Sequence, residues 1–194
     1  GIRIGREGKV EIERSRVEGE IGIEVGEESE IEIGEGVEVE GGEVGIKVGG
    51  ARETELRGIS VVSKGKAIEA GDGVVEVVGS EIEGEIEIEG EGEIRVLGSK
   101  VEGGISSRDI GEIEIEGSEV KSEEIEIGGG SGIRIVGSDI DVSKSMSTEG
   151  RVEIIRSNLD IEEGINKRKE EAIKVEGSKI EGDVYINEGE IEIE

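Results

Sequence analysis

The sequence contains no proline, cysteine, histidine, phenylalanine or tryptophan, and each absence excludes a kind of chemistry or structure. Without Cys and His there is no thiolate or imidazole catalysis, no Cys/His zinc site and no disulfide framework. The lack of cysteine also removes the usual sign of the redox compartment. The missing proline is typical of a chain built from interior strands, which cannot spare a backbone N–H.

Positive charge is scarce as well. The chain has 51 acidic and 23 basic residues, which gives a formal net charge of -28. Binding to DNA or RNA relies on clustered Lys and Arg, so we expect no nucleic-acid partner. No apolar run approaches about 18 residues, and no basic-then-apolar leader precedes the first strand-like segment. We therefore expect a soluble chain with no membrane partner, whose localisation is otherwise unknown.

Glutamate, glycine and aliphatic residues are abundant, and they alternate with a period of two. Examples are Ile31-Glu32-Ile33, Ile86-Glu87-Ile88 and Ile113-Glu114-Ile115. Alternation of Ile or Val with a polar residue predicts strands that bury one face. These runs are short and end at Gly or Ser, so the 194 residues hold many short strands.

The strands recur at a nearly constant spacing. A frame of apolar, x, apolar, x, x, Ser, x, apolar, x, Gly starts at nine positions that lie 19 to 23 residues apart. The starts are Val10, Ile31, Thr54, Val75, Ile94, Ile113, Ile133, Val152 and Ile173, of which Ile31 and Thr54 begin the weakest copies. A period of about 20 residues indicates a repeat architecture in which each unit stacks on its neighbours.

Each copy also holds a second strand that begins 11 to 13 residues after the start, such as Ile21-Gly22-Ile23 or Val184-Tyr185-Ile186. One coil therefore comprises about three short strands joined by corners. A string of β-hairpins is the alternative, but it would need two-residue Asn-Gly or Asp-Gly loops. Only Asp72-Gly73 has such a sequence, so the hairpin alternative is disfavoured.

We predict an all-β fold in which residues 1–194 form a single-domain right-handed parallel β-helix. It would contain about nine to ten coils of roughly 19–23 residues each. Left-handed solenoids also use short Ile and Val strands, but they run on strict hexapeptide units, which the spacing here does not follow.

Serine occupies the sixth frame position in seven copies: Ser15, Ser80, Ser99, Ser118, Ser138, Ser157 and Ser178, with Gly36 and Ile59 in the two weak copies. A serine nucleophile needs an adjacent base, usually His, and the chain has no His. We interpret the row as a hydroxyl ladder that hydrogen-bonds backbone groups at a corner from coil to coil. We therefore predict no catalytic residue and no enzyme activity.

Three segments interrupt the repeat. Residues 51–70 follow it only loosely, and residues 143–150 are expected to replace a clean second strand with a polar loop. Residues 162–171 insert a charged stretch with the composition of one helical turn. Irregular segments of a regular scaffold often carry function, although loops without any function fit the pattern equally well.

Only six of the acidic residues are aspartate, and Asp139, Asp141 and Asp160 fall in adjacent coils. Asp139 shares a frame position with Asn158, and Asp141 shares one with Asp160 and Glu181. Outward residues at equal positions stack about 4.8 Å apart, a spacing at which carboxylates can share a cation such as Ca²⁺. The alternative is an ordinary solvated acidic face. We predict no metal and no cofactor, with the three aspartates as the cation candidates.

The unit IEIEGSEV at residues 113–120, with the related VEVVGSEIEG and IKVEGSKIEG, resembles the coil of the pectin-lyase-like right-handed β-helices. That superfamily includes polysaccharide lyases and hydrolases. Its pectate-cleaving members use outward Asp clusters that hold Ca²⁺, together with an Arg or Lys base. The resemblance implies that only Asp139, Asp141 and Asp160 stand in for those acids here, and no motif supplies the matching Arg.

Two further resemblances concern structural proteins. VEGEI at residues 17–21 and IEGDV at residues 180–184 resemble bactofilins, β-helical proteins that polymerise end to end. The whole chain more closely resembles a de novo designed β-solenoid. Of its acids 45 are Glu, its binary pattern has almost no exceptions, and its corners take Gly or Ser by rule. Its surface positions are charged throughout, as designers choose them.

Three functional hypotheses follow. The first is a designed structural scaffold with no native biochemical activity, expected to be a monomer without partners. The second is a structural β-helix that assembles end to end through its edge strands at high salt, although like charges at the ends oppose the joint. The third is a cation- or carbohydrate-binding β-helix that acts through the three aspartates.

Overall fold

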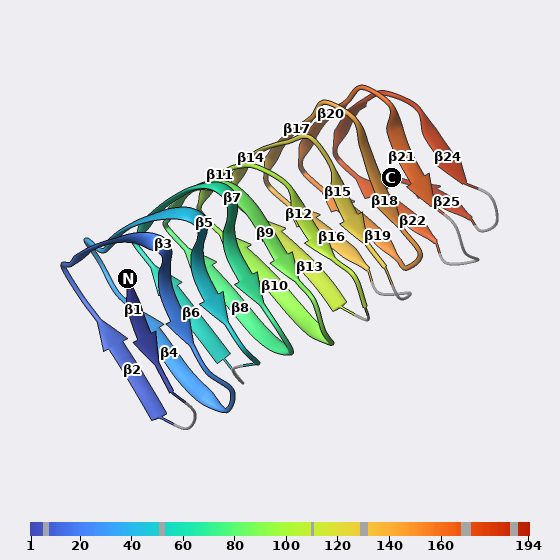
Figure 1. Ribbon diagram of the computed structural model, residues 1–194. Helices are drawn as coiled ribbons and strands as arrows, with labels where there is room; N and C mark the ends of the chain where they lie inside the picture. The colour runs from blue at the N-terminus through green and yellow to red at the C-terminus, as the bar shows by residue number, and fades with distance from the viewer. Residues whose placement is uncertain (6–7, 51–52, 110, 129–131, 168–171, 187–189) are drawn as a thin grey trace.

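The alternating sequence folds into parallel strands, and each coil of the chain stacks on the coil before it. The computed structural model describes residues 1–5, 8–50, 53–109, 111–128, 132–167, 172–186 and 190–194, and every element in them is a strand. The coils stack along one axis into an elongated rod with the N-terminal and C-terminal coils at opposite ends (Figure 1). Two sheets run along this rod, and their neighbouring strands pair in parallel.

The first sheet has ten strands, one from each pass of the chain. In order they are β2 (Gly8–Ile12), β4 (Ser29–Ile33), β6 (Glu53–Arg57), β8 (Gly73–Val78), β10 (Gly92–Leu97), β13 (Gly111–Glu116), β16 (Ile133–Val136), β19 (Val152–Ile155), β22 (Ile173–Glu176) and β25 (Ile191–Ile193). The nine predicted frame starts lie in one register column that begins at Val10 and passes through Ile173. Ile191 adds a tenth member, so the predicted repeat is confirmed at every step.

The second sheet has fifteen strands and covers the remaining faces of the rod. Its first strands are the short β1 (Ile2–Ile4) and the long β3 (Arg16–Val25), β5 (Glu38–Val48), β7 (Ser60–Ala70) and β9 (Glu81–Ile88). After β9 each coil contributes two short strands, which pair in two separate rows. One row is β11 (Lys100–Glu102), β14 (Glu119–Ser122), β17 (Asp139–Val142), β20 (Asn158–Ile161) and β23 (Lys179–Glu181); the other is β12 (Ile105–Ser107), β15 (Ile125–Ile127), β18 (Ser145–Thr148), β21 (Gly164–Lys167) and β24 (Val184–Ile186).

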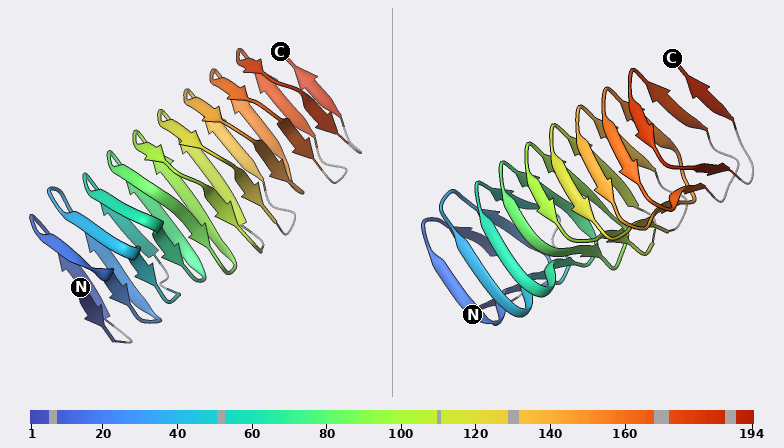
Figure 2. Two further views of the ribbon diagram at one scale, coloured as in Figure 1. Left: turned by 45° about the horizontal axis from the view of Figure 1, so that its top comes forward. Right: turned by 90° about the horizontal axis from the view of Figure 1, so that it is seen from above.

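The later coils therefore contain the three short strands that the sequence predicts, and Figure 2 shows the stack from two further sides. The predicted all-β parallel solenoid is confirmed, with about nine turns.

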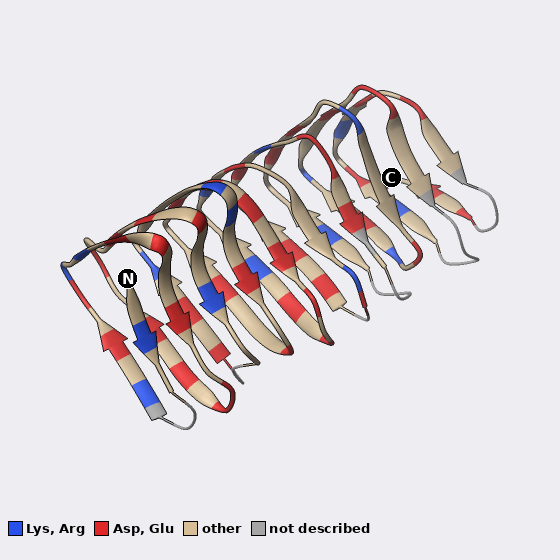
Figure 3. Cartoon of the chain, in the orientation of Figure 1, with Lys and Arg blue, Asp and Glu red and all other residues tan. Residues whose placement is uncertain are grey.

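Aliphatic side chains fill the interior of the rod. The inward columns consist almost entirely of Ile and Val, and members such as Ile23, Ile113 and Ile165 are completely buried. β-branched side chains suit these columns because they pack well against neighbours on a pleated surface. Outward positions carry the acidic and basic residues that mark the strands and corners in Figure 3. The period-two pattern thus separates the core from the charged surface.

A residue with left-handed backbone turns the chain between the two sheets in each coil. Glycine takes this position in most coils, for example Gly117 with φ 59°, whereas Arg14 and Arg156 take it with φ 45° and 49°. A Cβ added at Gly117 would meet nothing within 4 Å. Backbone conformation alone therefore favours glycine there, since residues with a Cβ are strained at positive φ.

The sequence frame was wrong about one member of the serine column. It placed Gly36 there, but the second coil has one more residue before its corner, and Gly36 takes the left-handed position with φ 73°. Val37 occupies the serine position and is completely buried. The N–H of Ser60 donates to Val37 O, just as the N–H of Lys100 donates to Ser80 O in a later coil. A fixed frame does not anticipate a one-residue insertion.

The segments expected to be irregular form strands where the structure describes them. Within residues 53–70, β6 and β7 pair with their neighbours, but the register between β7 and β9 shifts between Val62 and Lys66 and again between Lys66 and Ile68, so this segment is irregular as expected. Within residues 143–150, β18 pairs with β15 and β21 instead of forming a polar loop, because Met146 fills an inward isoleucine position. In the last segment, Gly164–Lys167 is strand β21 instead of a helical turn. Residues 51–52 and 168–171 lie outside the described residues.

Candidate functional site

The three candidate aspartates lie together on one outward face. Asp139 and Asp141 are on β17 and Asp160 is on β20, and the register pairs Asp141 with Asp160 and Asp139 with Asn158. A groove of about 500 Å³ runs over this face, and its lining includes all three aspartates and Lys121. The structure thus brings these residues together at the spacing that the repeat predicts.

Nitrogen donors approach the carboxylates in this aspartate groove. The Asn158 Nδ2 atom donates a hydrogen bond of 2.7 Å to Asp139 Oδ1, and Lys121 lies in register beside Asp141. Among the described residues, no group of three or more acidic side chains is placed to hold a metal ion. The cation interpretation therefore stays a hypothesis, and it rests on the register pair of Asp141 and Asp160.

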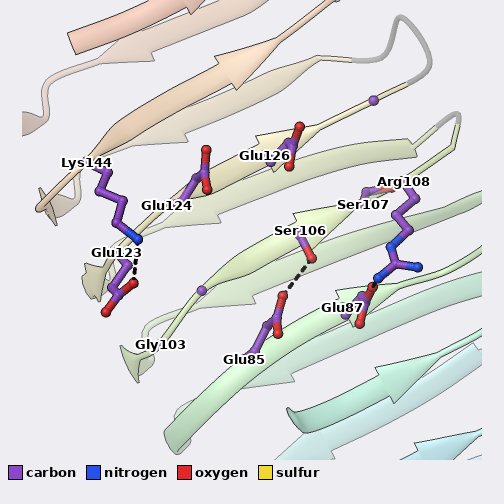
Figure 4. A pocket seen from close by; sticks show the side chains of 12 residues that line it. Glu85, Glu87, Gly103, Ser106, Ser107, Arg108, Glu123, Glu124, Glu126 and Lys144 are labelled. Atoms are coloured by element: carbon purple, nitrogen blue, oxygen red, sulfur yellow. Dashed lines mark hydrogen bonds and ion pairs between the residues drawn. The ribbon is translucent and has the colours of Figure 1, made fainter. Parts of the chain in front are cut away.

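A second groove, which the sequence reasoning missed, lies on the adjoining face over β9, β12 and β15 (Figure 4). Its volume is about 570 Å³, and carboxylates form much of its lining. Ser106 is a small residue in an outward column, with Glu87 on one side of it and Glu126 on the other. The short serine side chain leaves room between the longer ones, and this accounts for the hollow.

The polar contacts in this second groove join one coil to the next. Ser106 Oγ donates to Glu85 Oε1 at 3.1 Å, and Lys144 Nζ lies 2.8 Å from Glu123 Oε2 (Figure 4). The hydrogen bond from Lys144, aided by its charge, lowers the pKa of the Glu123 carboxyl. Ser106, Glu85, Lys144 and Glu123 therefore already serve as partners between neighbouring coils.

A chain of ion pairs begins at the edge of this groove and crosses four coils. The carboxylate of Glu87 is 2% exposed and lies 2.7 Å from the Arg108 guanidinium and 2.5 Å from Lys66 Nζ. Lys66 is also 2.9 Å from Glu69, which in turn contacts Lys47. These five residues come from β5, β7, β9 and the segment after β12, so the ion-pair chain links consecutive strands of the second sheet.

Burial and charge act in opposite directions on this ion-pair chain. Burial favours the neutral form of Glu69, but the hydrogen bonds from Lys47 and Lys66 outweigh it and lower the pKa of the Glu69 carboxyl. Burial also disfavours the charged form of Lys66, yet its hydrogen bonds to Glu87 and Glu69 raise the pKa of the ammonium. Glu69 and Lys66 are therefore both charged at neutral pH. Their ion pairs link neighbouring strands, which is a structural role and not one in proton transfer.

The sequence contains a usable signal for this ion-pair chain. Lys47 precedes Glu69 by 22 residues, which is the spacing of the coils that hold β5 and β7, so the two residues lie in register. Opposite charges one repeat apart on outward positions predict cross-strand pairs. The burial of Glu87 cannot be predicted in this way, because it depends on two cationic side chains, Lys66 and Arg108, that contact its carboxylate from different coils.

The outward column of the ten-stranded sheet changes character along the rod. From Glu76 onward its charges alternate in sign through Arg95, Glu114, Arg134, Glu153, Lys174 and Glu192. Arg134 contacts both of its neighbours, at 3.2 Å in the case of Glu153. The first members of the column, Glu11, Glu32, Glu55 and Glu76, are all acidic. Like charges on adjacent strands repel, so the alternating half is the better paired one.

Six of the seven serines in the row, from Ser80 to Ser178, form the predicted hydroxyl ladder, whereas Ser15 Oγ donates to Glu13 O within its own coil. Ser118 Oγ accepts a hydrogen bond of 3.1 Å from the N–H of Ser99 and lies 3.0 Å from Val96 O. The same N–H to Oγ bond recurs along the row, from the N–H of Ile59 to Ser178 Oγ at the far end. Because these backbone groups lie at a buried corner, the ladder provides partners that water cannot supply.

Comparison with known proteins gives no match: no family model, no curated protein and no solved structure matches this chain. The resemblances drawn from the repeat unit therefore extend only to the parallel solenoid itself. In the described part of the chain, no helix has the length and apolar character needed to span a membrane.

Proposed function

We propose that this chain is a de novo designed β-solenoid, wound right-handed, that serves as a structural scaffold and carries out no native biochemical reaction. The observation that supports the proposal is the unbroken register of the inward columns. One column runs from Val10 to Ile191 through ten successive strands, and Thr54 is its only polar member. Nearly every repeat position is thus used to stack one coil on the next.

The local chemistry supports the same proposal. Natural sites usually break local rules of patterning and capping, and this chain follows those rules at most positions of its corners, core and surface. The exceptions include Arg14 and Arg156 at left-handed corners and Thr54 in the core, and they are scattered along the rod instead of meeting at one site. Several polar groups of both grooves, such as Asp139, Glu85 and Glu87, take part in contacts between coils. For the handedness, the support is general: connections between parallel strands of one sheet are right-handed in nearly all proteins.

The competing function is cation or carbohydrate binding in the aspartate groove. It is tested by thermal unfolding of the protein with and without millimolar calcium, and separately with polygalacturonate, an acidic polysaccharide. Because the chain carries a net charge of -28, any salt that screens repulsion raises the melting temperature. Each calcium sample is therefore compared with sodium chloride at the same ionic strength.

The Asp141→Ala variant is the test, and Glu102→Ala, two strands away in the same outward column, is its matched control. The scaffold proposal predicts that calcium gives no more stabilisation than sodium at equal ionic strength, and that both variants behave alike. A saturable stabilisation by calcium or the polysaccharide that disappears in Asp141→Ala, but persists in Glu102→Ala, would overturn the proposal.

A further inference from the structure

The chain contains a single Asp-Gly pair, Asp72-Gly73, whose chemistry differs from that of the other aspartates. The main-chain nitrogen that follows an aspartate can attack the side-chain carboxyl and isomerise the residue. Glycine favours this attack, because it has no side chain to block the nitrogen and rotates freely. The other five aspartates precede Ile or Val, whose stiff β-branched side chains crowd the nitrogen. Asp72 is therefore the aspartate with the most reactive sequence context.

The pair lies at a corner that is one residue shorter than the corner stacked on it. Gly71 and Asp72 are the only residues between β7 and β8, whereas residues 89–91 separate β9 from β10. The flanking positions are in register, since Ala70 pairs with Ile88 and Gly73 pairs with Gly92. The longer corner therefore has one main-chain N–H and one C=O with no main-chain counterpart in the shorter one.

The side chain of Asp72 supplies the missing acceptor. The N–H of Glu91 donates a hydrogen bond of 2.9 Å to Asp72 Oδ1, and the N–H of Gly73 donates one of 3.1 Å to Glu91 O. On the other side of the corner, the N–H of Glu89 donates to Ala70 O in the usual main-chain manner. Both reacting groups of the Asp-Gly pair are thus held by the main chain of Glu91. We call these two hydrogen bonds the corner clamp.

Isomerisation requires both groups to be released from the corner clamp. The Gly73 nitrogen attacks Cγ of the protonated Asp72 carboxyl, a C–N bond forms, and the amide hydrogen and the carboxyl hydroxyl leave as one water molecule. Water then adds to the resulting succinimide ring. Opening at Cγ restores aspartate, whereas opening at the main-chain carbonyl carbon gives isoaspartate, in which the main chain runs through Cβ and Cγ.

We infer that Asp72 is the site of spontaneous aspartate isomerisation in this chain, and that the corner clamp suppresses the reaction while the corner is closed. The Gly73 nitrogen loses its hydrogen only by giving up the bond to Glu91 O. The Asp72 carboxyl turns toward that nitrogen only by giving up the bond from the Glu91 N–H. This inference concerns a chemical modification and is independent of the scaffold proposal.

Isomerisation would prevent the corner clamp from forming again. Isoaspartate lengthens the main chain by one carbon and moves the free carboxylate onto Cα, so the acceptor of the Glu91 N–H is displaced. The corner is already one residue short, and its register with Gly92 depends on that length. The modification therefore accumulates in chains whose corner has opened.

The first test compares the rate of isoaspartate formation in the folded full-length chain and in the same chain unfolded in guanidinium chloride. Both are kept in warm, mildly acidic buffer and digested, and electron-transfer fragmentation distinguishes isoaspartate from aspartate. We expect isoaspartate chiefly at Asp72, formed roughly a hundredfold more slowly in the folded protein, at about tenfold for each hydrogen bond. Equal rates in the two states, or faster formation at another aspartate, overturn the inference.

Gly90→Ala opens the corner clamp within the folded protein. The added Cβ would overlap Asp72 Oδ1 and displace the carboxylate from the Glu91 N–H, while the backbone of Gly90 is not left-handed and accepts alanine. Gly104→Ala is the matched control, because its Cβ meets other atoms only at 3.5 Å or beyond. Circular dichroism checks that both variants fold. We expect isomerisation roughly tenfold faster in Gly90→Ala than in the control, and equal rates overturn the inference.

Glu91→Ala tests whether the main chain is responsible. This variant loses the Glu91 carboxylate but keeps the N–H and the carbonyl that make the corner clamp. We expect it to isomerise at the rate of the parent. A rate as high as that of Gly90→Ala would assign the protection to the Glu91 carboxylate and overturn the corner clamp. If Gly90→Ala does not fold, Glu91→Ala and the comparison of folded and unfolded chains still decide the question.

Discussion

Thr54 lies in register beside Val75 in an inward aliphatic column, and its hydroxyl has no hydrogen-bond partner among the described residues. The side chain is 1% exposed, so water does not reach the hydroxyl from the surface. A buried polar group without a partner costs about 1–3 kcal/mol. Valine has nearly the same shape and lacks the hydroxyl, as its neighbours in the column show.

Thr54→Val is therefore expected to stabilise the protein by about 1–2 kcal/mol, measured by chemical denaturation. The matched control is Thr148→Val. Thr148 is equally buried, but its Oγ1 accepts a hydrogen bond from the N–H of Gly150, so its loss is expected to destabilise. If the two variants shift stability in the same direction, the account of the core polar groups is wrong.

The left-handed corners give a second prediction, with opposite signs at two equivalent positions. Gly117→Ala is expected to destabilise by about 1 kcal/mol, because the added Cβ meets no atom but φ is 59°. Arg156→Gly, at φ 49°, is expected to stabilise by roughly half to one kcal/mol. Thermal unfolding measures both. A neutral Gly117→Ala would mean that the corner relaxes out of the left-handed conformation.

The Lys47–Glu69–Lys66 pairs give a prediction for pH. The folded-state pKa of Glu69 is lowered from its ordinary 4.5, so its stabilising effect is present above that value and disappears as the pH falls through the folded-state pKa. Glu69→Gln is therefore expected to be less stable than the parent by about 1–2 kcal/mol at neutral pH. The gap should close on acidification, as the pH falls below 4.5 and then through the lowered folded-state pKa of Glu69.

Glu126→Gln is the control for this experiment, because Glu126 occupies the same outward column and is exposed. Removing its charge also relieves general repulsion, so the control separates that effect from the loss of the ion pairs. A Glu69→Gln deficit that does not change with pH would contradict the ionic origin of the stabilisation.

The stacking order could be predicted from the sequence because, once the repeat length of a solenoid is known, the position of each residue on the next coil follows from it. The nine frame starts, the serine ladder and the aspartate pairs all follow from counting one repeat forward, and they lie in register as expected. The repeat placed Gly36 in the serine column wrongly, because one residue is inserted before that corner. It also failed over residues 143–150, where Met146 and Thr148 are unusual inward residues that still pack.

The second groove and the ion-pair chain were harder to predict for a different reason. A hollow at Ser106 depends on the lengths of side chains on both neighbouring strands, and not on any property of serine itself. The burial of Glu87 depends on Lys66 and Arg108, which approach from two different coils. A repeat sequence predicts which residues lie in register on adjacent coils. It does not predict the burial of a side chain that several others cover together.

The account depends most on the register itself, and distances between spin labels measure it directly. Glu38, Glu81 and Asn158 are exposed members of one outward column, and Asn158 is six strands from Glu38 and four from Glu81. With cysteines in place of these residues, electron–electron resonance should give about 29 Å for the Glu38–Asn158 pair and about 19 Å for the Glu81–Asn158 pair. Two distances that differ by about 10 Å would confirm one rise per coil along a straight column. Equal distances, or a longer one for the Glu81 pair, would contradict the stacked solenoid.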